Sequence, residues 1–154
     1  MDFLVERMTR QGLAARSATA TAAGVAAAAV GLQAQDGGAA RLGVRARSSA
    51  VDEAAVINAI QHERSVVRTW LMRSTVHLVA AGDARWMAEL YGPVMERSYR
   101  TRWRKLGITE AVIEAAATHA RELLDGRGLT RHELAAELAE RGIEIGRASC
   151  RERV

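Results

Sequence analysis

Residues 66–79 read VVRTWLMRSTVHLV, in which two runs rich in Val, Thr and Trp are separated only by Arg73-Ser74. Residues with branched or aromatic side chains favour strands, and two such runs with so short a break indicate an antiparallel hairpin. The break lacks the Asn-Gly pair that favours the tightest turns. We therefore predict a pair of strands over Val66–Met72 and Thr75–Val79.

Several helices are predicted before this hairpin, from apolar periodicity and from cap residues. The second of them is rich in Ala, which lets neighbouring helices approach closely, and the paired Gly37-Gly38 is expected to separate it from the third. Asp52 is a suitable N-cap for the fourth. The predicted helices are Phe3–Leu13, an Ala-rich segment ending near Leu32, Ala39–Arg47 and Glu53–His62.

Short helices followed by a two-stranded hairpin are the element order of a winged helix, a helix-turn-helix with a β-hairpin wing. We therefore predict a mainly α fold with a small β-hairpin, and a first winged helix domain over residues 1–91. The aromatic content of 4% and the single Pro argue against a sandwich or barrel of many short strands.

The same order of elements begins again after the hairpin. Pro is favoured in the first turn of a helix, so the Gly-Pro pair is expected to start a new one. The predicted helices are Gly82–Leu90, one that starts at Gly92-Pro93, Glu110–Leu124 capped by Thr109, and Leu134–Arg141 after a Thr130–Glu133 capping box. We assign residues 92–144 to connecting helices and to the helix-turn-helix start of a second, truncated winged helix in tandem with the first.

The C-terminal residues have a different character. Residues 145–154 read IGRASCRERV, which resembles, codon for codon, the translation of a short-read sequencing adapter. The alternative is a genuine basic arm that binds phosphate. We favour the adapter. We therefore expect this tail not to be native, the natural protein to be longer, and the present fragment by itself to be inactive.

Composition excludes several classes of protein. The chain has 154 residues, of which 49% are hydrophobic, so it can bury a modest core and is not disordered. A single Cys excludes a disulfide framework, and the four His lack metal-site spacing, so we expect no metal and no cofactor. The net charge of +4 falls to +2 without residues 145–154, which hold three Arg and one Glu. Basicity is therefore weak evidence for a nucleic-acid partner.

No stretch reaches the roughly 18 to 20 consecutive apolar residues that a membrane-spanning helix needs. Residues Ala18–Leu32 imitate the apolar part of a secretory signal. However, Asp2 and Glu6 lie in the region that should be basic, and the apolar run is mostly Ala. We therefore expect a cytoplasmic protein with no membrane partner.

Two stretches carry a resemblance to a known family. Gly31–Asp36 reads GLQAQD, and Glu63–Val79 reads ERSVVRTWLMRSTVHLV. Together they resemble the winged helix DNA-binding domain family that includes AlkZ-like DNA glycosylases, which excise alkylated bases and unhook interstrand crosslinks. The resemblance covers nearly the whole chain to about Ile143. It implies three tandem winged helices in a complete member, of which this chain would hold the first and part of the second.

The resemblance also implies a catalytic Gln-x-Gln motif, and the matching residues are Gln33 and Gln35. A cationic alkylated purine leaves readily, so the enzyme mainly positions water and stabilises a cationic sugar. A Gln amide can accept a hydrogen bond from water and can donate one to phosphate or sugar. Asp36 and His77 are candidates for supporting roles. The alternative is that the glutamines only bond loop backbone and that His77 is a hydrogen-bonded core histidine.

Arginines are the candidates for contacts with DNA phosphates. Arg41 and Arg45 are four residues apart on the third predicted helix, and so share one face. For each single Arg the alternative is that its side chain is solvated at the protein surface. For the basic helix, the alternative is that Tyr99 and Trp103 pack it between the two modules. The predicted DNA-binding residues are Arg41, Arg45, Arg47, Arg68, Arg73, Arg97, Arg100 and Arg104.

Element order and resemblance together predict a bacterial protein that binds double-stranded DNA. In its intact form we expect a monomeric, monofunctional DNA glycosylase that excises alkylated bases or unhooks crosslinks. The alternatives are a non-catalytic winged helix DNA-binding protein or transcriptional regulator, and a protein-interaction scaffold. The sequence does not indicate which lesion is recognised.

Overall fold

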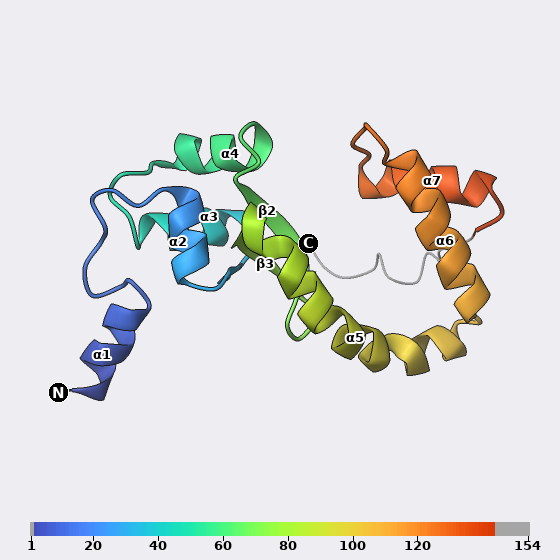
Figure 1. Cartoon of the computed structure of the whole chain (residues 1–154), viewed down its shortest axis with the longest axis horizontal. Helices are drawn as coiled ribbons and strands as arrows, with labels where there is room; N and C mark the ends of the chain where they lie inside the picture. The colour runs from blue at the N-terminus through green and yellow to red at the C-terminus, as the bar shows by residue number, and fades with distance from the viewer. Residues whose placement is uncertain (1, 144–154) are drawn as a thin grey trace. The chain divides into compact units, whose positions relative to one another are not determined.

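The computed structural model describes residues 2–143, and the predicted tail lies outside them. The chain divides into two compact units, of which the first ends at Arg97 and the second begins at Ser98. Helices dominate both units, and one small antiparallel sheet lies in the first (Figure 1), so the prediction of a mainly α fold with a hairpin is confirmed. The helices of the first unit are α1 (Phe3–Arg10), α2 (Ala22–Ala28), α3 (Gly37–Arg45), α4 (Glu53–Gln61) and the greater part of α5 (Ala81–Lys105).

The hairpin lies where it was predicted. Strand β2 (Val66–Leu71) pairs antiparallel with β3 (Thr75–Ala80). In the turn between them, Met72 has φ 53° and Ser74 has φ 60°. These two residues therefore adopt the left-handed backbone that Asn-Gly would otherwise supply.

A third strand was not predicted. Strand β1 (Leu32–Gln33) pairs with the free edge of β3, so the strand order is β1-β3-β2. The sequence predicts an Ala-rich helix that ends near Leu32 and is separated from the next helix at Gly37-Gly38, whereas α2 ends at Ala28 and Leu32–Gln33 form a strand. The strand is too short to show the alternation by which strands are recognised, and its partner lies far away in the sequence. The expectation was therefore wrong at the position of Gln33.

The two faces of the sheet pack against different helices. Leu32, Val66 and Leu78 share one face and pack in a core with α2, with Val44 of α3 and with Val56 of α4. Much of the rest of this core is Ala, which lets the short helices approach closely, as expected from the composition. This core positions β1, and therefore also Gln33 within the strand and Gln35 just after it.

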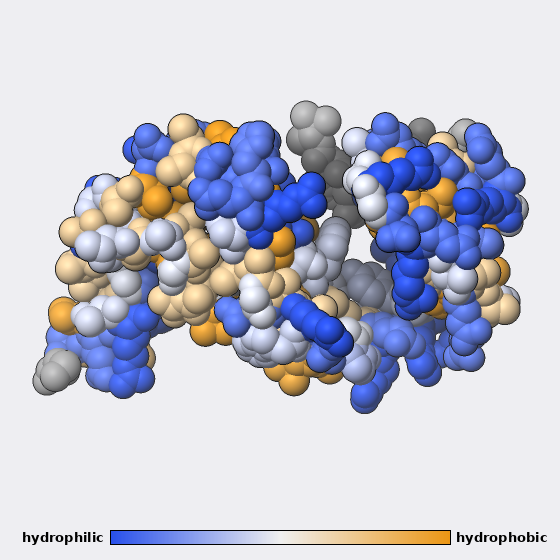
Figure 2. All heavy atoms as spheres, turned by 45° about the horizontal axis from the view of Figure 1, so that its top comes forward, coloured by the Kyte–Doolittle hydropathy of each residue, from blue (hydrophilic) through white to orange (hydrophobic). Residues whose placement is uncertain are grey.

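On the opposite face, Leu71 and Val79 pack with Met87 of α5. Trp70, next to Leu71 along the strand, points to the other face, the one that carries Val66 and Leu78, but it pairs with Val76 near the hairpin turn and is 55% exposed. Hydrophobic atoms also reach the surface elsewhere on the first unit, as Figure 2 shows.

Capping residues set the starts of three helices in the first unit. The side chains of Thr21, Asp36 and Asp52 each accept a hydrogen bond from the backbone N–H three residues later, at 3.1, 2.7 and 2.7 Å. Because Asp36 caps α3, this helix begins at Gly37 and ends at Arg45. The predicted start at Ala39 was two residues late, because Gly37 and Gly38, which separate α2 from α3, also form the first turn of α3.

Residues 81–105 form the single helix α5, so the prediction of two helices here was wrong. Pro93 lies inside this helix. A proline removes one backbone donor and crowds the preceding turn, but good helix formers lie within a turn on both sides, at Ala88–Leu90 and Met95–Arg97, and the helix continues. The boundary between the two units also falls within α5.

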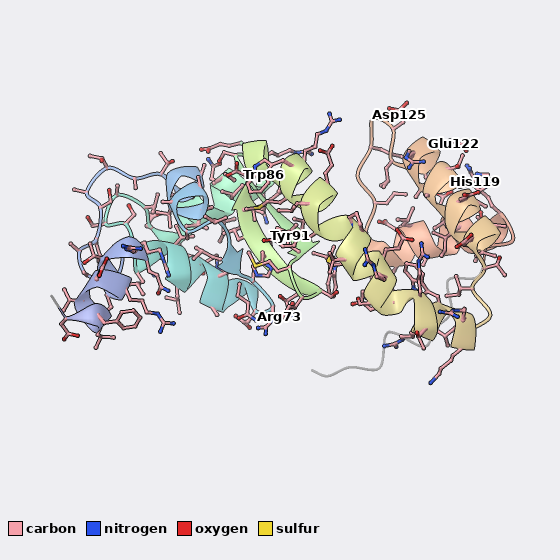
Figure 3. All side chains as sticks on the ribbon, turned by 60° about the horizontal axis from the view of Figure 1, so that its bottom comes forward. Arg73, Trp86, Tyr91, His119, Glu122 and Asp125 are labelled. Carbon is pink, nitrogen blue, oxygen red and sulfur yellow. The ribbon has the colours of Figure 1, made fainter. Side chains whose placement is uncertain are left out.

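The second unit contains α6 (Glu110–Leu123) and α7 (Arg131–Glu140), packed around Leu123, Leu138 and Ile143. Both predicted caps, Thr109 and the Thr130 capping box, are confirmed. On its surface Arg141 forms an ion pair with Glu122 of α6 at 2.9 Å, and His119 Nδ1 lies 3.2 Å from the same carboxylate; His119 and Glu122 are labelled in Figure 3. The assignment of residues 92–144 to the start of a second winged helix stays a prediction.

The capping box of α7 gives a prediction about protonation. Thr130 N–H donates to Glu133 Oε2 at 2.7 Å, and Thr130 Oγ1 accepts from Glu133 N–H at 3.3 Å. The backbone and then the side-chain hydrogen bonds of Thr130 lower the pKa of Glu133 below its ordinary value of 4.5. Thr130→Ala is expected to raise this pKa, because only the backbone bond remains.

Carboxyl NMR titration of wild type and Thr130→Ala measures the change. Because folding lowers the pKa, the carboxylate stabilises α7 above the unfolded pKa, and this contribution is lost as pH falls through the folded pKa. Equal pKa values of Glu133 in both proteins would show that the Thr130 side chain does not stabilise the Glu133 carboxylate.

Along residues 2–143, no helix combines the length and hydropathy that a membrane-spanning segment needs.

Candidate functional site

Gln33 is held by backbone pairing at the edge of the sheet. In β1 its neighbour Leu32 is buried and pairs with Leu78, whereas Gln33 is exposed and pairs with His77. The chain enters this strand through Val30 and Gly31, which have φ values of 53° and 97°. This turn connects the end of α2 to β1 and orients Gln33 away from the core.

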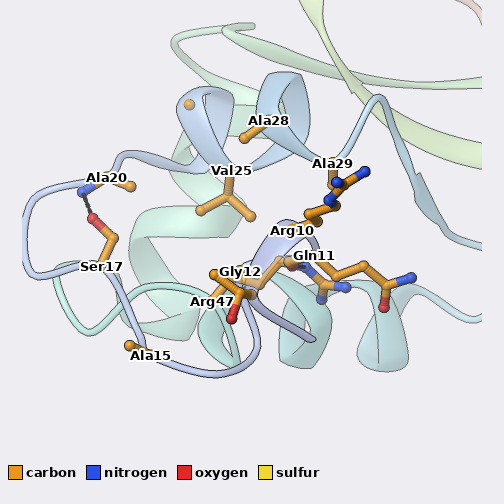
Figure 4. Close-up of a pocket in the computed structure, with 12 residues that line it drawn as sticks. Arg10, Gln11, Gly12, Ala15, Ser17, Ala20, Val25, Ala28, Ala29 and Arg47 are labelled. Atoms are coloured by element: carbon orange, nitrogen blue, oxygen red, sulfur yellow. Dashed lines mark hydrogen bonds between the residues drawn. The ribbon is translucent and has the colours of Figure 1, made fainter. Parts of the chain in front are cut away.

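Gln33 borders a small polar pocket of about 280 Å³. A neighbouring pocket of about 250 Å³, shown in Figure 4, shares Arg10, Gln11 and Arg47 with the first. Arg10 and Arg47 thus line the same space as Gln33, with Arg10 also ion-paired to Glu6. Two cationic residues at one pocket favour an anionic or strongly polar ligand. The residues that line the first pocket are Arg10, Gln11, Ala28, Ala29, Gly31, Leu32, Gln33 and Arg47.

Arg47 builds one wall of this pocket. Its Nε donates to the Gln11 carbonyl at 2.8 Å, and its Nη1 donates to the Gly43 carbonyl at 2.8 Å. It therefore links the segment after α1 to the last turn of α3. The role of Arg47 as a DNA contact stays a prediction; in the structure its guanidinium binds two backbone carbonyls of the pocket wall.

Gln35 is held differently from Gln33. Its side-chain Oε1 accepts a hydrogen bond from Val76 N–H at 2.8 Å, and Ala34 N–H donates to the Val76 carbonyl at 2.7 Å. The side chain of Gln35 thus extends the ladder between β1 and β3 by one bond. One acceptor position of its amide oxygen is thus used by the protein, and both donors of its amide nitrogen can meet a ligand.

The two predicted supporting residues have structural partners. The Asp36 carboxylate accepts from Ala39 N–H as the N-cap of α3. His77 is 7% exposed, and its Nδ1 lies 2.9 Å from the Thr75 carbonyl. Because a carbonyl only accepts, Nδ1 carries the proton and Nε2 of a neutral ring is an acceptor. His77 is therefore a hydrogen-bonded core histidine that also lies directly opposite Gln33 in the sheet.

Arginines of the first unit have distinct surroundings. Arg41 pairs with Glu53 of α4 at 2.8 Å, and Arg68 donates to the Ala34 carbonyl at 2.7 Å. The Nε of Arg45 is buried, and among the described residues it has no hydrogen-bond partner. Arg73 lies exposed in the hairpin turn (Figure 3). The guanidinium of Arg45 is thus partly buried, whereas Arg73 is open to solvent.

The remaining predicted DNA contacts lie on α5. Arg97, Arg100 and Arg104 are exposed and, in one unbroken helix, fall on one stripe. On a different stripe of the same helix Tyr99 and Trp103 stack on each other, with ring centroids 6.1 Å apart and planes at 18°.

Two residues of the pocket, Arg10 and Gln11, were not predicted as site residues. They reach Gln33 only because Arg47 holds the segment after α1, a contact between residues far apart in sequence. No local pattern could have indicated it. Within residues 2–143 no group of three or more His, Cys, Asp or Glu is placed to hold a metal ion.

Gly31 gives a test of how Gln33 is positioned. A Cβ at Gly31 would lie 3.1 Å from Val79 Cγ1, at a φ of 97°. Gly31→Ala is expected to destabilise the protein by about 1–2 kcal/mol through the backbone alone, and to displace β1. Urea unfolding measures the change in free energy.

The control is Gly82→Ala, in the first turn of α5, where nothing lies within 4 Å of the added Cβ. It is expected to be neutral or to stabilise by up to ~1 kcal/mol. If both substitutions had the same effect, the turn at Gly31 would not be what orients β1.

Comparisons with known proteins place this mainly helical chain among DNA glycosylases. The family described as DNA glycosylase AlkZ-like matches residues 7–152. The chain belongs to the AlkZ-like DNA glycosylase family, which confirms the resemblance stated from the sequence.

One curated protein and one solved structure, both from Streptomyces sahachiroi, are similar to the chain. An interstrand DNA cross-link repair glycosylase is 32% identical over 139 residues, covering 86% of this chain and 35% of the relative. The solved structure of DNA glycosylase AlkZ aligns with a TM-score of 0.74 at 32% identity, covering 87% of this chain and 36% of that one. The chain thus spans about a third of the length of these relatives.

Proposed function

We propose that this chain is the Gln33-bearing part of a monofunctional DNA glycosylase that hydrolyses the bond between an alkylated purine and its deoxyribose in double-stranded DNA. The observation that carries the proposal is the position of Gln33, exposed on β1 at a pocket that Arg10 and Arg47 also line. Membership of the AlkZ-like family supports it. The Streptomyces sahachiroi relative is named an interstrand DNA cross-link repair glycosylase. Unhooking of a crosslink is the same bond cleavage on a bridged base.

The reaction requires little general acid–base catalysis by the protein. An N7- or N3-alkylated purine is cationic and leaves as a neutral base, so the barrier lies mainly in placing water against a cationic sugar. In the proposal the Gln33 carbonyl oxygen accepts a hydrogen bond from this water. Arg10 and Arg47 lie on the same pocket and favour the phosphates beside the lesion.

Gln35 has a different role in the proposal. Because its oxygen is bonded to Val76 N–H, its nitrogen donates to the sugar or phosphate while the oxygen keeps the residue in place. Asp36 and His77 act by supporting α3 and the strand opposite Gln33. In the proposal Gln33 therefore positions the water, and Gln35 binds the sugar or phosphate of the DNA.

The DNA-binding surface completes the proposal. Helix α3 with Arg41 and Arg45 enters a groove, and the β2–β3 hairpin with Arg73 is the wing of a winged helix. Arg97, Arg100 and Arg104 on α5 contact phosphates. The protein acts as a cytoplasmic monomer with a second winged helix beginning within residues 92–144. Family membership supports this function over a non-catalytic regulator.

The experiment is base release by the full-length gene product from duplex DNA containing 7-methylguanine. Free 7-methylguanine is separated by chromatography, and unmodified duplex is the control substrate. We expect release from the modified duplex alone. Binding that weakens steeply with salt, without any release, would favour the non-catalytic regulator. If salt-dependent DNA binding were also absent, only the protein-interaction scaffold would remain.

A further inference from the structure

The side chain of Arg68 crosses the sheet to the segment between the two glutamines. Arg68 lies on β2 opposite Leu78 of β3, and Leu78 in turn lies opposite Leu32 of β1. Its Nη2 donates to the carbonyl oxygen of Ala34 at 2.7 Å in a partly buried bond. The guanidinium therefore spans from the outer strand over β3 to the residue after β1.

Ala34 is the fully buried residue of the Gln33–Ala34–Gln35 segment. Its N–H donates to the Val76 carbonyl, and the Val76 N–H donates to Gln35. The bond from Arg68 supplies a donor for the Ala34 carbonyl. Since a buried carbonyl without a donor is costly, loss of Arg68 would favour rotation of this peptide and movement of both glutamines.

The same guanidinium also lies beside the first turn of α3. A Cβ built on Gly37 would lie 3.8 Å from Arg68 Nη1 and 3.4 Å from Arg41 Nη1. Arg41 is already paired with Glu53. Arg68 thus joins the outer strand, the residue between the glutamines and the start of α3.

We propose that Arg68 is a positioning residue for Gln33 and Gln35, and that its main effect is on the rate of base excision and not on the affinity for DNA. The proposal rests on the function proposed above. It replaces the assignment of Arg68 as a phosphate contact, because one of its donors is committed to the Ala34 carbonyl. Displacement of catalytic groups by about 1 Å can lower a rate of the order of 100-fold.

The first test uses Arg68→Met and Arg68→Lys in the full-length protein. Single-turnover release of 7-methylguanine at saturating protein gives the rate, and titration at several salt concentrations gives affinity and salt slope. We expect Arg68→Met to lower the rate about 10- to 100-fold, with affinity within about 2-fold and an unchanged slope. Arg68→Lys is expected to recover part of the rate, since one ammonium donor can replace the guanidinium at the carbonyl.

The matched control is Arg85→Met. The Arg85 side chain is 90% exposed on α5 and pairs with Glu89. Its loss is expected to change neither rate nor affinity. If Arg68→Met weakened binding and lowered the salt slope by about one at an unchanged rate, Arg68 would be a phosphate contact and the proposal would be wrong.

A second readout does not depend on activity. Hydrogen exchange of the segments 32–36 and 75–80 is expected to be about 10-fold faster in Arg68→Met than in wild type, with residues 53–61 unchanged as an internal control. If the wild-type protein released no base, only the proposed function would be refuted. The hydrogen-exchange comparison would still test whether Arg68 positions the glutamine segment. Unchanged exchange in these segments would overturn the positioning role.

Discussion

Gln33→Ala is expected to lower the single-turnover rate of 7-methylguanine release by about 100- to 1000-fold, the usual effect of removing one hydrogen-bonding group from a reacting centre. Gln33 is exposed on β1 and, apart from its backbone pairing with His77, its side chain is free to face the pocket it borders. Folding is expected to change little, because no core contact is lost. The measurement is base release at saturating protein, with DNA affinity determined in parallel.

Gln61→Ala is the matched control, because Gln61 is an exposed glutamine at the end of α4. It is expected to leave the rate unchanged. Gln35→Ala should lower the rate and also loosen the end of β3, since Val76 N–H loses its acceptor. Wild-type rates in both Gln33→Ala and Gln35→Ala would remove these glutamines from the mechanism.

Leu78→Ala is expected to destabilise the protein by about 2–5 kcal/mol, the range found when a buried Leu leaves a cavity. Leu78 is fully buried at the centre of the sheet, between Arg68 on β2 and Leu32 on β1. Its removal opens the core under β1. Urea unfolding of the full chain measures the loss of free energy, and base release reports the accompanying displacement of Gln33.

Leu90→Ala provides the control for this substitution. Leu90 lies on α5 and is 58% exposed. Its truncation is expected to change the free energy of unfolding by no more than about 0.5 kcal/mol. Comparable losses for Leu78 and Leu90 would mean that the sheet core does not stabilise the first unit.

Local patterns predicted those elements whose signals lie within a few residues. The hairpin, the caps Asp52 and Thr109, and the Thr130 capping box were all found, because β-propensity and capping act between neighbours in the chain. The same local rules failed at Gly92-Pro93. There the proline signal was outweighed by the helix-forming turns on either side.

The candidate site was predicted in part. Gln33, Gln35 and His77 came from family resemblance and from the sequence around the hairpin, and the sheet brings Gln33 and His77 side by side. The distinction between a free Gln33 and a Gln35 bonded to β3 could not be predicted. It depends on the pairing of segments about forty residues apart, which no local pattern encodes.

The amino-acid sequence by itself determined the mainly helical character, the hairpin, most helix starts and the family, since each follows from short-range patterns of residue type. Only the tertiary structure decided that β1 exists, and that Arg47 and Arg68 bind backbone carbonyls around the glutamines. An arginine in a sequence can meet phosphate, carboxylate or carbonyl equally well. Which of these it meets is decided by long-range packing of the chain, because the partner atom belongs to a distant segment.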